Sequence, residues 1–300
     1  MFALAHLSDP HLPAIPRPRL IELAGKRGLG LVNWHLRRRR EHRAEILEAL
    51  LADIAAQSPD HIAVTGDLVN VALPGEFASA RAFLERLGPP ERVSFVPGNH
   101  DAYVRAALQH SDTSLRHYVT GDDGAGEGAS LYPYFRRRGP LAVIGASTAL
   151  PTGPFMATGR LGADQIKRLD HLLASIPIDL FRVVLLHHPP ISVPGDRLKR
   201  LIDARAFRDT LERRGAELVL FGHIHVTSVT RLPGREHTIP AVSVASASAT
   251  VKSEEPACYH LFRISRENGA WICDMTTRGF APGRSGIAEI GRRRLAPANQ

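Results

Sequence analysis

The sequence predicts an α/β fold, and two patterns carry this prediction. Six short apolar runs have the length and composition of buried strands, and stretches with apolar residues at helical spacing separate several of them. Strands that alternate with helices are typical of α/β domains. The apolar runs are residues 2–8, 61–70, 92–101, 141–147, 181–190 and 216–225, and the helical stretches are residues 46–54, 77–87, 166–173 and 198–211.

The pattern changes after residue 225, where strand-like segments follow one another without intervening helices. These segments predict a second, more antiparallel sheet beside the first; they are residues 227–233, 237–246, 258–265 and 270–277. Asn268-Gly269 has the composition of a two-residue hairpin turn, which would place Cys273 roughly opposite Ile264. Cys258 and Cys273 are therefore not expected to pair across this hairpin.

Composition limits the class of protein. The chain has 300 residues, 44% of them hydrophobic, which is enough for one large domain or two smaller ones. Two cysteines are too few for a disulfide framework and suit a reducing compartment. The N-terminus lacks the features of a secretory signal, and no apolar run approaches the roughly 20 residues of a membrane span. These features indicate a cytoplasmic protein, either soluble or bound peripherally to the inner face of the membrane.

The net charge of +8 is concentrated in two segments. Residues 17–43 contain nine Arg or Lys and two Glu, a net charge of +7, and residues 284–300 carry a net charge of +3. The rest of the chain is therefore slightly acidic, so the basic character belongs to two local surfaces rather than to the whole fold.

The basic segment at residues 17–43 has two interpretations. Its glycines, Gly25, Gly28 and Gly30, predict two short helices. Clustered arginines with Trp34 and several leucines are typical of elements that bind an anionic membrane surface. Alternatively, the apolar residues pack on the domain's own core and the arginines are solvated. Nucleic-acid binding is the weaker prediction, because no interleaved aromatic residues accompany the arginines.

Polar residues follow the ends of five predicted strands. In α/β folds the carboxyl ends of strands meet at one edge of the sheet, where active sites form. These residues are Asp9, His11, Asp67, Asn99, His100, His187, His223 and His225. Carboxylates and imidazoles without thiolates suit Mn, Fe or Zn, and so many ligands exceed what one ion can use. The sequence therefore predicts two divalent ions, with Asp67 bridging them from the tight Gly66-Asp67 turn.

These polar residues lie in five motifs that occur in a fixed order between residues 9 and 225. The motifs are Asp9-x-His11, Gly66-Asp67, Gly98-Asn99-His100-Asp101, His187-His188-Pro189 and Gly222-His223-Ile224-His225. In these motifs the sequence resembles the calcineurin-like metallophosphoesterase superfamily. The resemblance implies a two-sheet αββα sandwich with helices on the outer faces. Together with the charge pattern it predicts a single domain over residues 1–281, a basic helical insertion at about 12–43 and a basic C-terminal tail at 282–300.

The resemblance also implies a role for each motif residue. One ion is implied to bind Asp9, His11, Asp67 and His225, and the other Asp67, Asn99, His187 and His223. His187 is preferred to His188 as a ligand because it stands two residues before Pro189. His100 is implied to face the leaving-group oxygen or the phosphate without binding metal, while Asp101 tunes its orientation and charge.

The activity implied is hydrolysis of phosphoric esters by a metal-bridging hydroxide, with Mn²⁺ as the first choice of metal and Fe or Zn as alternatives. The sequence GDLVN, residues 66–70, indicates the branch. Asn70 stands where purple acid phosphatases have a tyrosine ligand, and the Asp-Arg continuation of protein phosphatases is missing. The segment is more similar to bacterial phosphodiesterases of cyclic nucleotides and glycerophosphodiesters, so phosphodiester hydrolysis is the main prediction.

Other activities stay open. If the basic segment binds a membrane, a pyrophosphate hydrolase acting on a substrate of the lipid A precursor type is the second prediction. A nuclease is less favoured, since 300 residues leave little room for an added DNA-binding domain. A non-enzymatic scaffold is disfavoured because every expected ligand position is filled. The sequence identifies neither the substrate nor the oligomeric state.

Overall fold

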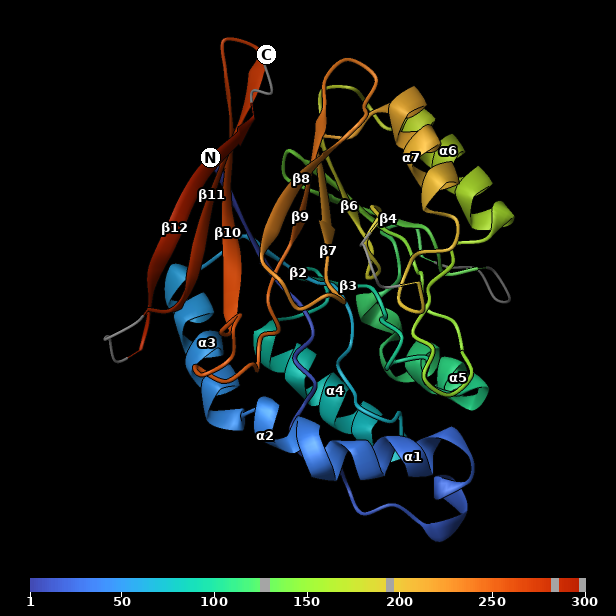
Figure 1. Ribbon diagram of the computed structural model, residues 1–300. Coiled ribbons are helices and arrows are strands. Elements are labelled where there is room, and N and C mark those ends of the chain that lie inside the picture. Colours follow the sequence, from blue (N-terminus) through green and yellow to red (C-terminus); the bar gives the residue numbers. More distant parts are fainter. Residues whose placement is uncertain (125–129, 193–196, 282–285, 297–300) are drawn as a thin grey trace.

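The computed structural model describes residues 1–124, 130–192, 197–281 and 286–296, and these form two six-stranded sheets packed face to face (Figure 1). The first sheet has the order β12-β11-β10-β1-β2-β3 and the second β4-β5-β6-β7-β9-β8. The strands are β1 (Phe2–Leu7), β2 (His61–Val64), β3 (Val93–Phe95), β4 (Tyr134–Arg138), β5 (Leu141–Gly145), β6 (Phe181–Leu185), β7 (Leu218–Phe221), β8 (Ser228–Leu232), β9 (Ile239–Ser243), β10 (Cys258–Glu267), β11 (Ala270–Phe280) and β12 (Ile287–Ala296).

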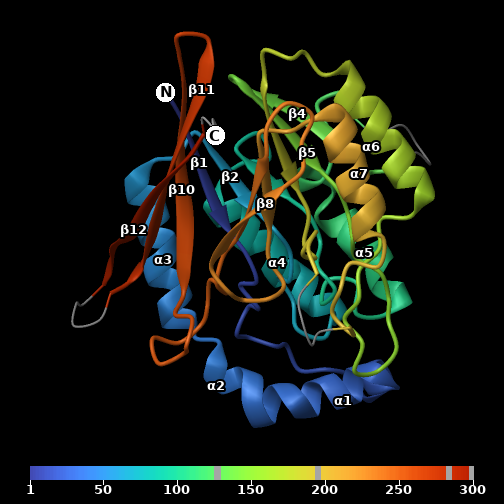
Figure 2. The ribbon, with the colours of Figure 1, turned by 45° about the horizontal axis from the view of Figure 1, so that its top comes forward.

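Helices flank the two sheets, and those of the insertion lie at one end of the sandwich. Those of the first half are η1 (Leu20–Leu23), α1 (Lys26–Asn33), η2 (Trp34–Arg38), α2 (Arg39–Glu41), α3 (Ala44–Gln57), α4 (Pro74–Leu87), α5 (Arg105–Ser114) and η3 (Arg116–Tyr118), followed later by α6 (Ala163–Ser175) and α7 (Ala204–Arg214). Figure 2 shows α6 and α7 side by side on one flank of the molecule and α3 on the opposite flank. The αββα sandwich is thereby confirmed.

The two-residue period of the strands produces these layers. On β10, the Tyr259 hydroxyl donates to Asp53 of α3, whereas the His260 ring donates to the Ser243 carbonyl of β9 in the other sheet. On β6, Val183 belongs to the core shared by the two sheets, and Val184 packs against α6 and α7. Successive side chains therefore bury opposite faces of each sheet.

The sequence predicted that the strands after residue 225 form a sheet of their own. This prediction is wrong, because these strands divide between the two sheets. β8 and β9 extend the second sheet. In the first sheet β10 pairs antiparallel with β1, and β11 and β12 continue the sheet beyond β10. This division satisfies the backbone groups at an edge of each parallel sheet that would otherwise be open. The predicted hairpin at Asn268-Gly269 is confirmed, since Cys273 lies opposite Ile264 and both cysteines are free.

The predicted C-terminal tail is wrong for residues 287–296. This stretch forms β12, which pairs with β11 over most of its length and buries Leu295. Its arginines lie along the exposed edge strand, and two of them pair with acidic residues, Arg292 with Glu289 and Arg294 with Asp274. Charges on an edge strand discourage pairing with other chains. The remaining residues of the predicted tail lie outside the described residues.

The basic insertion has a helical break at Gly25 (φ 70°), between η1 and α1, but Gly28 and Gly30 do not interrupt the second helix, which is longer than predicted. From α1 through the π-helical η2 to α2 the backbone stays helical, so residues 26–41 form one continuous insertion helix. Gly30 lies within this helix, at a position that has no room for a side chain. A Cβ there would come within 2.4 Å of the Tyr103 hydroxyl. The glycine thus serves close packing rather than a break. Figures 1 and 2 both show this helix running along one end of the sandwich.

None of the helices in the described part of the chain has the length and apolar character that crossing a bilayer requires. The helix predicted at 198–211 begins only at Ala204.

Candidate active site

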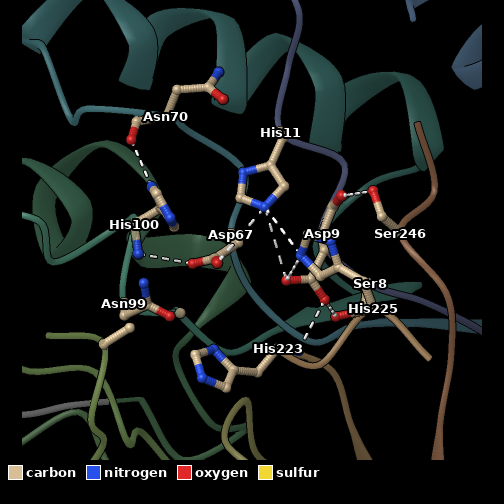
Figure 3. Close-up of polar contacts among 12 residues, drawn as sticks. Ser8, Asp9, His11, Asp67, Asn70, Asn99, His100, His223, His225 and Ser246 are labelled. Atoms are coloured by element: carbon tan, nitrogen blue, oxygen red, sulfur yellow. Dashed lines mark hydrogen bonds and ion pairs between the residues drawn. The ribbon is translucent and has the colours of Figure 1, made fainter. Parts of the chain in front are cut away.

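The predicted site residues meet at one end of the sandwich, where the strands that carry them reach their carboxyl ends (Figure 3). Asp9 and His11 follow β1, Asp67 follows β2, and Asn99 and His100 follow β3. His187 follows β6, and His223 and His225 follow β7. Backbone hydrogen bonds join these loops, since the Asp9 amide donates to Gly66 and the His11 amide to Asp67. The prediction that five strand ends converge is correct.

A first group of ligand atoms comes from Asp9, His11 and His225, and these atoms lie within 4.8 Å of one another. His225 Nε2 is 3.2 Å from Asp9 Oδ1 and 3.3 Å from His11 Nε2. Asp9 and His11 are fully buried. Distances of this size leave room for one ion among the three side chains.

A second group surrounds His187. Its Nε2 lies 3.4 Å from Asp67 Oδ2, 3.3 Å from Asn99 Oδ1 and 3.2 Å from His223 Nδ1. Asp67 Oδ2 is also 3.8 Å from His11 Nε2 in the first group. The Asp67 carboxylate therefore stands between the two groups, which is the place that a bridging ligand must occupy.

His188 also has a ring nitrogen within 4.8 Å of ligand atoms of His187 and His223, but both of its ring nitrogens already have hydrogen-bond partners. Nδ1 lies 2.7 Å from the Thr148 hydroxyl, and Nε2 lies 3.1 Å from the Ala157 carbonyl. The His188 ring instead packs against the His223 ring at 4.4 Å between centroids. This geometry supports the choice of His187 over its neighbour.

The backbone of the site is strained. Left-handed φ angles are uncommon for residues other than glycine and cluster at functional sites. Five predicted ligands have them: Asp9 at 52°, His11 at 36°, Asp67 at 54°, His223 at 71° and His225 at 54°. The surrounding fold holds these conformations, which aim the side chains at a common centre.

Two glycines make room for the ligands. A Cβ on Gly222 would lie 1.9 Å from Ser8 Oγ and 2.5 Å from Asp9 Oδ2. A Cβ on Gly98 would lie 2.2 Å from Asp67 Oδ1. These two positions therefore require glycine, because any side chain would collide with Ser8, Asp9 or Asp67.

The donor set fits divalent metal. Asp9 Oδ1 is buried without a hydrogen-bond donor, a costly arrangement for a carboxylate that a cation would relieve. Its other oxygen accepts from the Ser8 hydroxyl at 2.6 Å and the His223 amide at 3.0 Å, and the Ser246 hydroxyl donates to the Asp9 carbonyl. Ser8 and Ser246 orient this ligand, and the sequence analysis missed both.

The protonation states of His11 and His223 agree with metal binding, whereas His187 would have to release a proton on binding a metal ion. Burial lowers the pKa of His11 well below its usual value and that of His223 to about 3, so both are neutral, the form that binds a metal ion. Burial opposes ionisation of Asp67, but His187 and His100 outweigh it and lower the pKa of this carboxyl. Burial likewise opposes a charge on His187, yet Asp67 raises the pKa of His187 to about 9. The carboxylates thus favour positive charge at this position.

Asp101 was predicted to orient the His100 ring, but no contact joins its carboxylate to that ring in the described residues. Its carboxylate accepts hydrogen bonds at 2.8–3.3 Å from four backbone amides, those of Asp67, Leu68, Val69 and Gly98. Buried amides at two strand ends need an acceptor, and Asp101 supplies it. The His100 ring is oriented instead by the Asn70 carbonyl, to which Nδ1 donates at 2.5 Å. Sequence offers no signal for this partner, since any residue has a carbonyl.

A groove of about 520 Å³ opens beside His225. Leu36, Arg37 and Arg40 of the insertion helix form one wall, and residues of the 249–255 loop, including Lys252, form the other. His225 is the most exposed of the ligands, with 32% of its side chain accessible. Glu41 and Glu255 line the groove as well, so it connects the candidate metal site to a surface of mixed charge in which three cationic and two acidic side chains stand beside Leu36.

An αββα sandwich with carboxylate, imidazole and amide groups gathered at its strand ends is the arrangement expected of a metal-dependent hydrolase. The sequence profile of the family described as calcineurin-like phosphoesterase matches residues 2–227, and the chain belongs to this family. The chain is accordingly a phosphoesterase, and the resemblance noted in the sequence is confirmed.

Curated relatives share one name. A protein from Rhodococcus erythropolis, named a probable cyclic nucleotide phosphodiesterase, is 27% identical over 250 residues, which cover 82% of this chain and 70% of that protein. A Synechococcus protein of the same name is 29% identical over 236 residues, 74% of each chain. Among solved structures, a purple acid phosphatase from yellow lupin (Lupinus luteus) seeds aligns with a TM-score of 0.59 at 12% identity over 95% of this chain. The alignment spans 53% of the lupin protein, and this likeness shows the fold alone.

Proposed function

We propose that the chain hydrolyses phosphodiesters with two divalent metal ions, Mn²⁺ being the expected metal. The observation that carries the dinuclear proposal is the position of Asp67 Oδ2, 3.8 Å from His11 Nε2 and 3.4 Å from His187 Nε2. The names of the curated relatives support a diester rather than a monoester substrate. The groove beside His225 supports it as well, because a diester carries a second organic group that needs space outside the metal site.

Each site residue has a defined task in this proposal. Asp9, His11, Asp67 and His225 would hold one ion, and Asp67, Asn99, His187 and His223 the other. Two such ions supply activation of water and stabilisation of charge on the phosphate oxygens. The Asn70 carbonyl fixes the Nδ1 proton of His100, which leaves Nε2 as the ring atom available to the substrate. Asp101 holds the two loops that carry Asp67 and Asn99 at a fixed separation.

A comparison of two chromogenic esters tests the diester proposal. With Mn²⁺ supplied, kcat/KM for bis-(p-nitrophenyl) phosphate is expected to exceed that for p-nitrophenyl phosphate by about tenfold or more, a difference of roughly 1.4 kcal/mol in activation free energy. The groove beside His225 is the expected cause of this preference, because it can contact the second aryl group of the diester and the monoester has no such group. A higher kcat/KM on the monoester would reverse the assignment. A panel of cyclic nucleotides, glycerophosphodiesters and lipid-linked pyrophosphates then separates the substrate classes.

We further propose that the outward face of the insertion helix docks on an anionic membrane surface. Leu29, Val32 and Leu36 are exposed on this helix, with more than half of each residue accessible to solvent, and Leu36 also lines the groove beside His225. Arg37 and Arg40 are exposed on the same helix, so apolar and cationic groups are presented together. Trp34 takes no part, contrary to the sequence-based prediction, because it is only 7% exposed and packs inward. Membrane binding is the feature that would favour a lipid-type phosphate ester as substrate.

Flotation with phosphatidylglycerol–phosphatidylcholine vesicles at low and high salt tests this surface. Replacing Arg37 and Arg40 by Gln is expected to weaken partitioning by about 2 kcal/mol, roughly 30-fold at low salt, since each arginine contributes about 1 kcal/mol near a negative bilayer. Val32→Ser with Leu36→Ser should weaken it independently of salt. Ile178→Ser removes an equally exposed apolar side chain elsewhere and is the matched control. If the wild type does not float at low salt, the membrane proposal and the lipid-type substrate both fail.

A further inference from the structure

The inward face of the insertion helix is built for contact with the active-site loops. Arg27, Gly30, Trp34 and Arg38 recur at intervals of three and four residues, which places them on one side of a helix. The Arg27 guanidinium donates to the carbonyls of Val71 and Ala72, and Gly30 packs against Tyr103. Trp34 is buried. Arg38 is the last member of this row, and it reaches the catalytic end of the sandwich.

Arg38 faces His100 without a proper acceptor. Its Nη1 lies 3.3 Å from His100 Nδ1, but that nitrogen already donates to the Asn70 carbonyl. Two donors therefore meet, and neither satisfies the other. The ion pairs found within the described residues do not include Arg38. An anion placed beside these groups would supply the acceptor that the guanidinium needs.

The guanidinium of Arg38 lies close to the candidate metal site. Its Nη1 is 3.3 Å from the His100 ring, and that ring lies edge-on to the His11 ring at 4.9 Å between centroids. Arg38 is half-buried. Its charge is thus directed at the metal site and is only partly screened by solvent.

The helix that carries Arg38 is fixed at both ends. Lys26 Nζ donates to Thr152 Oγ1 at 3.0 Å and lies 4.3 Å from the centre of the Tyr103 ring. At the other end, His42 Nδ1 is 2.7 Å from Ser248 Oγ, and the Thr250 amide donates to the Glu41 carbonyl at 3.0 Å. The backbone at Arg38 is therefore fixed before any ligand arrives, which lowers the entropy that binding would cost.

We propose that Arg38 binds a non-bridging oxygen of the substrate phosphate, beside His100, and so acts as a substrate-binding residue contributed by the insertion. The inference rests on the proposed phosphoester function of the site. A guanidinium suits the task because its planar fork matches phosphate oxygens and stays charged at every working pH. None of the five sequence motifs contains this residue, which lies in the basic insertion.

Isothermal titration of the metal-loaded protein with inorganic phosphate measures the interaction without turnover. Arg38→Gln is expected to weaken phosphate binding about 10- to 100-fold, the range for one lost hydrogen bond to a charged group. Arg38→Lys should recover part of the affinity. Arg39→Gln removes an exposed neighbouring charge of the same helix and should bind phosphate like the wild type.

Kinetics and metal analysis complete the test. With bis-(p-nitrophenyl) phosphate, Arg38→Gln should raise KM by a similar factor while the bound metal and the unfolding midpoint match those of Arg39→Gln. Unchanged phosphate affinity in Arg38→Gln would overturn the proposal. Loss of metal or of stability in that variant would overturn it too, because Arg38 would then act as a structural residue. Failure of the wild type to cleave diesters would refute the proposed substrate class alone, since the phosphate titration still reports on Arg38.

Discussion

Replacing Asp67 by Ala is expected to remove metal from both positions and to abolish turnover. Asp67 Oδ2 is the carboxylate atom that lies close to both His11 and His187, so its loss takes a negative charge from both groups at once. The effect should exceed the roughly 10- to 100-fold loss of metal affinity that follows removal of a residue behind the ligands. Metal analysis of protein purified without chelator, followed by diffraction at the metal edges, measures occupancy directly.

The variant Asp67→Asn, measured in the same way, removes the negative charge of the side chain but keeps its size and shape. The His100 amide donates to Asp67 Oδ1 at 2.7 Å, and an Asn side chain could keep that hydrogen bond. The fold of the loop should therefore survive while metal is lost. A mononuclear site in the fully metallated wild type would refute the two-ion proposal. Full occupancy of both positions in Asp67→Asn would show that the bridging charge is dispensable.

The convergence of the candidate ligands was predictable because the sequence shows where each strand ends. An apolar run that ends in a polar residue marks a carboxyl end, and parallel strands bring such ends together. The pairing of β1 with β2 and of β6 with β7 fulfils this expectation for Asp9, Asp67 and His187. Residue type and position along a strand were sufficient for this part of the site.

The partners of the ligands were less predictable because they depend on backbone groups and on distant loops. The Asn70 carbonyl that orients His100 has no residue-specific signal, and Ser246 reaches Asp9 from 237 positions away. The family resemblance implied that Asp101 acts on His100, its neighbour in sequence, yet its carboxylate turns toward the amides of the Asp67 loop. Adjacent residues at a tight turn need not face the same way.

The insertion shows how composition can mislead. Glycines and arginines suggested breaks and a solvated surface, but the spacing of residues 27, 30, 34 and 38 describes one helical face. Trp34 is buried because this face packs on the loops around Tyr103. Within a run of four arginines only that spacing distinguishes Arg38, which lies four residues after the buried tryptophan.

His100→Ala is expected to slow turnover about 10²- to 10⁴-fold, the range for a lost proton-transfer group, while both metal positions stay filled. Metal should be retained because His100 touches the ligand Asp67 through its backbone amide, which alanine keeps. The ring itself is held by the Asn70 carbonyl and lies edge-on to His11 at 4.9 Å between centroids. Removing it should therefore affect the reacting groups rather than the ligand set.

The leaving group decides which role His100 has. If the ring donates a proton to the departing oxygen, the defect of His100→Ala should be small for p-nitrophenoxide, which leaves readily as an anion, and larger for the alkoxide of a glycerophosphodiester. An equal defect on both substrates would indicate that the ring stabilises charge on the phosphate instead. His110→Ala, which removes an exposed imidazole at α5, is the matched control and should leave both rates unchanged. A loss of metal affinity in His100→Ala that exceeds the roughly 10- to 100-fold effect of removing a residue behind the ligands would contradict the ligand assignment.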